Sequence, residues 1–152
     1  MAAHIFVIMR ETAPKLIPEL KVTDFKKSLG FYMDIAQFKI EYDRSEHEFA
    51  MLSRGGAWLM IETLGDKSRA FKVGAFEHPF GRGIHLQIEV VDVRALYENF
   101  KNNNYPLFAE MEEKWYRKAS VELGNRQFLV QDPDGYLLRF FQNLGERPVS
   151  SA

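Results

Sequence analysis

A single arginine stands in the middle of a run of apolar residues near the end of the chain. Residues 136 to 142 read YLLRFFQ, and the arginine is Arg139. A charged group in a strand that is otherwise buried is costly unless a partner group or water reaches it. Any account of what this protein does must therefore explain the surroundings of Arg139.

Two large aromatic residues and an arginine follow one another in a strongly charged segment. Residues 112 to 125 read EEKWYRKASVELGN, with Trp115, Tyr116 and Arg117 in succession. The segment has no clear apolar period, so these side chains are poorly explained as core. Aromatic residues form 14% of the chain, which indicates either a large aromatic core or a cavity that stacks on a flat ligand. Trp115 is a candidate for ligand stacking or for packing at a dimer interface, and in an extended segment Tyr116 and Arg117 cannot both share its face.

Residue types that support nucleophilic or metal catalysis are scarce. The chain has no cysteine, and its four histidines show no HxH or HExxH spacing. The lack of cysteine excludes disulfides, thiolate metal sites and a cysteine nucleophile, and it fits a reducing cytoplasm. A lone histidine such as His85 is more often a hydrogen-bonded strand residue than a metal ligand.

The charge and size of the chain narrow the classes of partner. Lys plus Arg number 20 against 21 for Asp plus Glu, so no strong field attracts nucleic acid or anionic lipid. The only early apolar run, residues 5 to 9, is too short for a signal-peptide core or a membrane span. At 152 residues the chain fits one domain or two half-domains that share a core. We expect a cytoplasmic protein that binds neither nucleic acid nor membrane.

The sequence contains an internal repeat. Residues 16 to 32 read LIPELKVTDFKKSLGFY, and residues 84 to 100 read IHLQIEVVDVRALYENF. Each segment predicts a short strand, then Val-x-Asp, then an amphipathic helix of about three turns. Asp24 and Asp92, 68 positions apart, are predicted N-caps of these helices.

Three further strands are predicted after each helix. They cover residues 38 to 44, 48 to 54 and 57 to 63 in the first copy, and 106 to 112, 126 to 132 and 136 to 142 in the second. Gly55-Gly56 and Pro133-Asp134-Gly135 form the last turns, and the second copy holds about eleven extra residues before its last hairpin.

Each copy is therefore a β-α-β-β-β module, and the fold class is α+β, with two modules pairing into a curved mixed sheet around a cleft. The predicted parts are an N-terminal arm (1 to 15), a first module (16 to 64), a linker (65 to 83), a second module (84 to 143) and a C-terminal tail (144 to 152).

Four motifs in the correct order resemble the vicinal oxygen chelate superfamily, which includes glyoxalase I, extradiol dioxygenases, fosfomycin resistance enzymes and bleomycin resistance proteins. They are LIPELKVTDFKKSLGFY, HPFGRGI, EEKWYR and FLVQDPDGYLLRF. Together they are most similar to the bleomycin resistance group. The resemblance implies the fold more strongly than the function, since this fold supports many chemistries.

Enzymes of this superfamily hold a divalent metal with ligands on the first and last strands of each module. The resemblance places Ile17, His85, Met60 and Arg139 at those positions, and only His85 has a side chain suited to such a metal. It therefore implies no catalytic residues, no resident metal and no other cofactor. It also implies that Arg139 points into the cleft, where it either fixes the core as an ion pair with Glu19, Glu62 or Glu89, or meets an anionic or carbonyl group of a ligand.

The alternation of side chains along strands extends the candidate ligand-binding set. Trp58 and Met60 share a face, and Trp58 lies either in the cleft or against the helix layer. The full set of candidate ligand-binding residues is Trp115, Tyr116, Arg117, Arg139, His85, Gln87, Glu19, Trp58, Met60, Gln127 and Phe141.

The function implied by the resemblance is non-enzymatic binding and sequestration of a bleomycin-type glycopeptide antibiotic, or a similar aromatic small molecule, by a homodimer. Residues 1 to 15 resemble an arm exchanged between the two copies. Bleomycin-type drugs carry cationic tails, whereas this chain is nearly neutral. The alternative is a metal-dependent lyase, isomerase or dioxygenase with an unusual site built on His85 and carboxylates such as Glu19 or Glu62. A third possibility is a binding module for an unrelated aromatic metabolite or a peptide.

Overall fold

A computed structural model describes residues 13 to 65 and 71 to 150, so most of the expected N-terminal arm lies outside the described residues. The first module has the expected order of elements. It consists of β1 (Glu19–Val22), α1 (Phe25–Gly30), a π-helical turn (Phe31–Ile35), β2 (Lys39–Arg44), a short 3₁₀ turn (Ser45–His47), β3 (Phe49–Arg54) and β4 (Ala57–Thr63).

The second module repeats this order with longer strands. It consists of β5 (His85–Glu89), α2 (Val93–Asn102), β6 (Ala109–Lys118), β7 (Val121–Gln131) and β8 (Leu137–Pro148). No helix among the described residues has the length and apolar character needed to span a bilayer.

Each module forms its own four-stranded mixed sheet. The first sheet has the order β1-β4-β3-β2 and the second the order β5-β8-β7-β6, as the two topologically equivalent halves require. The pairs β1–β4 and β5–β8 are parallel, and the other neighbours are antiparallel. The α+β class and the two repeats are confirmed, and the expected curved sheet consists of two sheets of four strands.

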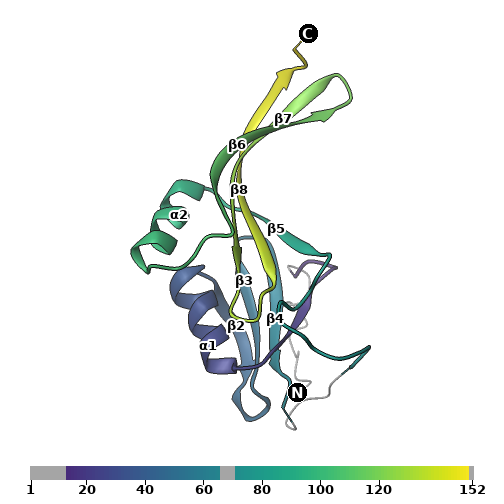
Figure 1. Ribbon diagram of the computed structural model, residues 1–152, viewed down its shortest axis with the longest axis vertical. Helices are drawn as coiled ribbons and strands as arrows, with labels where there is room; N and C mark the ends of the chain where they lie inside the picture. Colours follow the sequence, from purple (N-terminus) through teal and green to yellow (C-terminus); the bar gives the residue numbers. More distant parts are fainter. Residues whose placement is uncertain (1–12, 66–70, 151–152) are drawn as a thin grey trace, which may run out of the picture.

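Both helices begin at the predicted aspartates. The carboxylate of Asp24 accepts a hydrogen bond from the Lys27 amide at 3.0 Å, and that of Asp92 accepts one from the Ala95 amide at 3.1 Å. These bonds satisfy amides that have no partner within the first helical turn. Figure 1 shows α1 and α2 next to each other on one side of the molecule. The Asn99 side chain of α2 donates to the carbonyl of Ile35 at 2.8 Å, which ties the two helical segments together.

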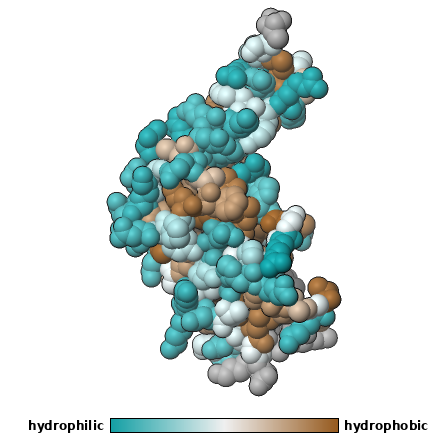
Figure 2. Space-filling view, in the orientation of Figure 1, coloured by the Kyte–Doolittle hydropathy of each residue, from teal (hydrophilic) through white to brown (hydrophobic). Residues whose placement is uncertain are grey.

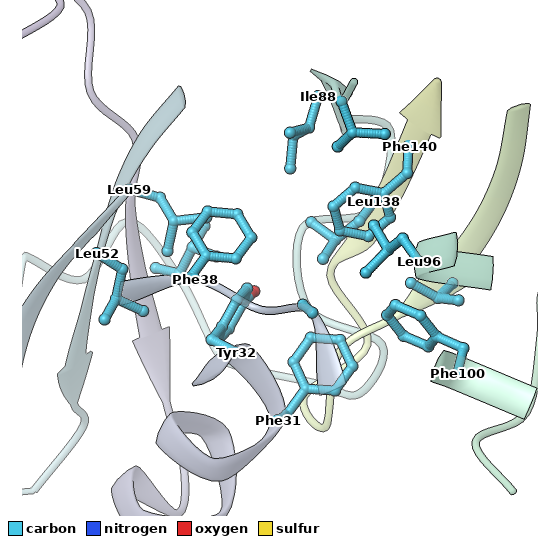
Figure 3. Close-up of a cluster of buried hydrophobic side chains, with 14 of the residues drawn as sticks. Phe31, Tyr32, Phe38, Leu52, Leu59, Ile88, Leu96, Phe100, Leu138 and Phe140 are labelled. Carbon is cyan, nitrogen blue, oxygen red and sulfur yellow. The ribbon is translucent and has the colours of Figure 1, made fainter. Parts of the chain in front are cut away.

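Both modules contribute to one aromatic core beneath the helices. In Figure 3, Leu52 and Leu59 of the first sheet lie on one side of this core and Leu138 and Phe140 of the second on the other. The fully buried ring of Phe100 contacts the rings of both sides. Its centroid lies 5.9 Å from that of Phe31, 5.6 Å from Tyr105, 5.4 Å from Phe128 and 5.9 Å from Phe140. Neither module would bury these rings alone.

The turn at residues 133 to 135 is confirmed, and it also joins the modules. The Tyr32 hydroxyl donates to the buried carboxylate of Asp132 at 2.7 Å, and the Thr23 hydroxyl donates to Asp134 at 2.5 Å. The Tyr136 hydroxyl donates to the Lys21 carbonyl at 2.9 Å. Burial, partly offset by the hydrogen bonds that Asp132 accepts, raises the pKa of Asp132 to about 6.

The extra residues of the second module form a hairpin arm, which here means the distal halves of β6, β7 and β8. This arm extends away from the body of the molecule in Figure 1, and mainly hydrophilic side chains cover the face seen in Figure 2. Residues 144 to 148, expected in the C-terminal tail, instead continue β8 and pair with β7. The arm shows no apolar period because most of its side chains on both faces reach solvent.

Candidate functional site

The faces of the two sheets opposite the helices are the candidate functional surface. Along β8, Leu138 and Phe140 are fully buried in the core, so Arg139 and Phe141 point to the opposite face, which we call the open face of the second sheet. Gln87 of β5 pairs in register with Arg139, and Gln127 of β7 pairs with Phe141. His85, two residues before Gln87, lies on the same face and is exposed.

A hollow of about 340 Å³ occupies this open face. We call it the Arg139 hollow. It is lined by Gln87, Glu89, Tyr116, Leu123, Asn125, Arg139, Phe141 and Asn143. Four of the eleven predicted ligand-binding residues thus lie together here, in a hollow that combines aromatic rings with hydrogen-bonding side chains.

Arg139 contacts neutral partners rather than a carboxylate. One terminal nitrogen of its guanidinium donates to the side-chain oxygen of Gln87, and the other donates to the Tyr116 hydroxyl at 3.4 Å. Its buried Nε has no hydrogen-bond partner among the described residues. Of the two alternatives for Arg139, the ion pair with Glu19, Glu62 or Glu89 is not formed among the described residues.

A buried glutamine supports the phenol that contacts Arg139. Gln127 is 3% exposed, and its side-chain nitrogen donates to the Tyr116 hydroxyl at 2.8 Å and to Glu112 at 3.1 Å. Its side-chain oxygen has no partner among the described residues. Tyr116, Gln127 and Arg139 therefore form one connected polar group beside the hollow.

The open face of the first sheet carries a closed cluster of charges. Lys21 is 8% exposed, and its Nζ lies 2.6 Å from Glu62 and 3.4 Å from Glu19. Burial is the largest cause that raises the pKa of Glu19, and a hydrogen bond with Glu62 is the second. Burial acts in the same upward direction on Glu62, but hydrogen bonds from Glu19 and Lys21 lower the pKa of Glu62 overall. Glu19 and Glu62, two of the carboxylates considered as partners of Arg139, instead pair with Lys21 within the first sheet.

Trp58 and Met60 lie on this same face of the first sheet. Met60 pairs in register with Glu19, and Trp58 lines a hollow of about 430 Å³. The other lining residues are Ala13, Pro14, Lys15, Ile17, Glu41, Tyr42 and Met51. Trp58 was expected either in the cleft or against the helix layer. In the structure it lies on the face away from the helices.

Trp115 and Arg117 point away from the Arg139 hollow. Trp115 pairs with Gly124 across β6 and β7, and its ring covers that glycine so closely that an added Cβ would lie 2.6 Å from it. The Arg147 guanidinium lies 4.1 Å from the centre of the Trp115 ring and donates to Glu122 at 2.6 Å. Because side chains alternate along β6, Tyr116 alone of the three consecutive residues faces the hollow.

Comparison with known proteins agrees with this architecture. The family model of the glyoxalase/bleomycin resistance protein/dioxygenase superfamily matches residues 16 to 140. The chain belongs to this superfamily.

A bleomycin resistance protein of Geobacillus stearothermophilus is 28% identical over 141 residues, which cover 84% of this chain and 96% of that protein. A superfamily member from Alicyclobacillus acidocaldarius, 18% identical, has a similar fold with a TM-score of 0.58 over 90% of this chain and 96% of that one. A protein from the mobile metagenome of V. pseudocholerae, also 18% identical, gives 0.61 over 83% of this chain and 91% of that one.

The metal that the superfamily implies does not fit the residues at the corresponding positions. Ile17 and Met60 offer no oxygen or nitrogen donor, and Arg139 brings a positive charge to the place where a cation would sit. Within residues 13 to 65 and 71 to 150, no three His, Cys, Asp or Glu side chains are grouped so that they could hold a metal ion. Among these residues, His85 is not grouped with Glu19 or Glu62 as the alternative metal site would require.

Several lining residues were not among the predicted ones. Leu123, Asn125 and Asn143 line the Arg139 hollow, and Tyr42 and Met51 line the hollow beside Trp58. Leu123 and Asn125 follow from Gln127 by strand alternation once β7 is known to continue back to Val121. Asn143 follows the last residue of the predicted strand, 136 to 142, whereas β8 continues to Pro148. The sequence pattern therefore gave no signal for Asn143.

Proposed function

We propose that this protein binds and sequesters a small molecule on the open face of the second sheet without catalysing a reaction. The observation that carries the proposal is the Arg139 hollow, in which a cation, a phenol and side-chain amides surround aromatic and aliphatic surface. Ligand-binding sites combine apolar surface with placed polar groups, and this hollow offers both. Sequestration needs no nucleophile, base or metal.

The first ligand to test is a bleomycin-type glycopeptide. The name of the relatives that match 84% of this chain supports an antibiotic ligand. The exposed ring of Tyr116 and the half-buried ring of Phe141 offer stacking surface, worth about 0.5–1.5 kcal/mol per aromatic pair beyond burial. Gln87 and Asn125 offer hydrogen bonds to the amides of such a ligand.

We also propose that the protein acts as a homodimer in the cytoplasm. Among the described residues, the outer strand of the second sheet, β6, has one neighbour, β7, and the hairpin arm extends beyond the body of the molecule. An exposed strand edge of ten residues readily pairs with another chain. Sedimentation should give a mass twice that of the 17.7 kDa chain, and a sedimenting species of one chain mass would contradict the dimer.

The experiment is a calorimetric titration of the metal-analysed protein with metal-free bleomycin. We expect saturable binding near one ligand per hollow. Tyr116→Ala should weaken binding at least tenfold, because it removes both the ring and the hydroxyl that Arg139 and Gln127 contact. Trp115→Ala is the matched control on the opposite face of the same strand and should leave binding within twofold.

Absence of binding would contradict the proposal, as would loss of binding in Trp115→Ala but not in Tyr116→Ala. A stoichiometric metal that disappears in a His85→Ala variant would instead direct the search to catalysis.

A further inference from the structure

We propose that the Arg139 hollow recognises the carboxylate of an aromatic carboxylic acid. This inference rests on the proposed ligand-binding role of the open face and names the class of ligand. Its occupant is defined by one negative charge attached to a flat apolar body.

The first step is the charge balance around Arg139. Its contacts with Gln87 and Tyr116 bring no negative charge, and no carboxylate among the described residues forms an ion pair with it. Lys21, a cation on the open face of the first sheet, has two carboxylates within 3.4 Å. A partly buried cation whose hydrogen-bond partners are neutral gains most from a ligand that supplies the missing charge.

The second step is the supply of hydrogen-bond donors. A carboxylate has two oxygens that together accept about four hydrogen bonds. The Tyr116 hydroxyl accepts from both Gln127 and Arg139, which leaves its own proton to donate. Arg139 offers its guanidinium, and the side-chain amides of Asn125 and Asn143 line the same hollow. Charge-assisted bonds from a guanidinium to a carboxylate are among the strongest that side chains form.

The third step is the apolar part of the hollow. Phe141, Leu123 and the ring of Tyr116 supply its aromatic and aliphatic surface. A volume of about 340 Å³ accommodates a small ring system. A flat aromatic body stacks on these rings while its acid group reaches Arg139.

The fourth step is the charge at the rim, which selects a monoanion. Glu89 is the one carboxylate among the residues that line the hollow. Glu89 would repel a doubly charged phosphate more strongly than a singly charged carboxylate, because like charges repel. The hollow therefore favours a carboxylate over a phosphate monoester of the same body.

The test compares 2-naphthoate, 2-naphthamide and 2-naphthyl phosphate as probes, each titrated into the wild-type protein by calorimetry. We expect 2-naphthoate to bind at least tenfold more tightly than either other probe. Equal binding of the neutral amide would overturn the role of charge, and tighter binding of the phosphate would overturn the choice of carboxylate. This arm uses no variant, so it does not depend on the folding of a mutant.

The variant arm assigns the effect to Arg139. Arg139→Gln should weaken 2-naphthoate binding at least tenfold and remove the preference over the amide, while Arg139→Lys should keep part of it. Arg117→Gln, which removes the same charge from the opposite face of β6, is the control and should bind like wild type. Wild-type affinity in Arg139→Gln would refute the proposal.

A bleomycin titration of the same samples separates the two proposals. If 2-naphthoate binds and bleomycin does not, the carboxylate site stands and the drug is rejected as ligand. If bleomycin binds and 2-naphthoate does not, the proposed function stands and the carboxylate site is rejected. If neither binds, both fail.

Discussion

The two sheets of this protein share a topology but treat a cation on their open faces in opposite ways. In the first sheet, Lys21 lies between Glu62 and Glu19 and is almost fully buried. In the second sheet, Arg139 contacts Gln87 and Tyr116 and forms no ion pair among the described residues. Glu19 pairs in register with Met60 as Gln87 pairs with Arg139, so the backbone places the two pairs equivalently.

The difference indicates that the repeated topology fixes where side chains lie, while their chemistry decides which sheet remains available to a ligand. A cation already held by two carboxylates has little to gain from a ligand anion, and removing it would leave the carboxylates unpaired. A cation with neutral partners is less costly to remove and gains more from an added anion. The first cluster is therefore structural and the second is the candidate binding site.

The largest expected effect is the loss of stability on removing Lys21. Lys21→Met leaves Glu19 and Glu62 together without their cation, and breaking a buried pair in this way costs about 3–5 kcal/mol of unfolding free energy. Arg139→Met should change the unfolding free energy by less than about 1 kcal/mol, because it leaves no charge unpaired. Urea denaturation at pH 7 measures both. Equal losses in the two variants would remove the distinction between the sheets.

The next effect concerns the turns that close the two sheets. The first sheet ends in the exposed turn at Gly55 and Gly56, whereas Asp132 is buried beside the turn of the second. The folded-state pKa of Asp132, about 6, lies above its ordinary value of 3.8, so the folded state binds the proton more tightly. The resulting stability is fully present below about pH 4 and is lost as the pH rises through 6, by about 3 kcal/mol.

Asp132→Asn should remove this component of the pH dependence. The amide oxygen can still accept from the backbone, and the Tyr32 hydroxyl can reverse to accept. Chemical denaturation of wild type and variant at pH 4.5 and pH 7 gives the four unfolding free energies that are needed. A variant with the same pH slope as wild type would show that Asp132 does not titrate in this range.

A smaller effect should follow from giving the second sheet the carboxylate that it lacks. Gln87→Glu places a negative charge beside Arg139, and the new ion pair should raise the unfolding free energy by at most about 1 kcal/mol. It should also weaken 2-naphthoate binding at least tenfold, because the guanidinium is then neutralised. Gln87→Leu is the uncharged comparison and should weaken binding less. Unchanged binding in Gln87→Glu would argue against Arg139 as the anchor.

The smallest effect separates the two faces of the second sheet. Gly124→Ala directs a methyl group against the Trp115 ring, which must shift, so we expect a loss of about 1 kcal/mol and a change in tryptophan fluorescence. Ligand binding in the Arg139 hollow should stay within twofold of wild type. A large loss of binding would mean that the faces are coupled.

Much of the fold followed from the sequence because its signals are local. The Val-x-Asp pattern located both helix starts, Gly55-Gly56 and residues 133 to 135 located the last turns, and the bounds of β4 agree with the predicted strand. Strand alternation also placed Gln87 and Phe141 on the face of Arg139.

The partners of the candidate site residues were not predictable in the same way. Whether Arg139 contacts a carboxylate or an amide depends on the register between strands and on the pairing of Glu62 with Lys21. No local sequence pattern encodes either. Trp115 was a candidate for ligand stacking or for packing at a dimer interface because its segment lacks an apolar period. The register of the β6–β7 hairpin instead sets its ring on Gly124.

The most direct test of the central claim is mapping of backbone amide chemical shifts in the wild-type protein during titration with metal-free bleomycin. If the open face binds the ligand, the largest changes fall on residues 85 to 89, 123 to 127 and 139 to 143 together with Tyr116. Changes confined to the helix face or to the surroundings of Trp115, or no changes at saturating ligand, would contradict a binding site on the open face of the second sheet.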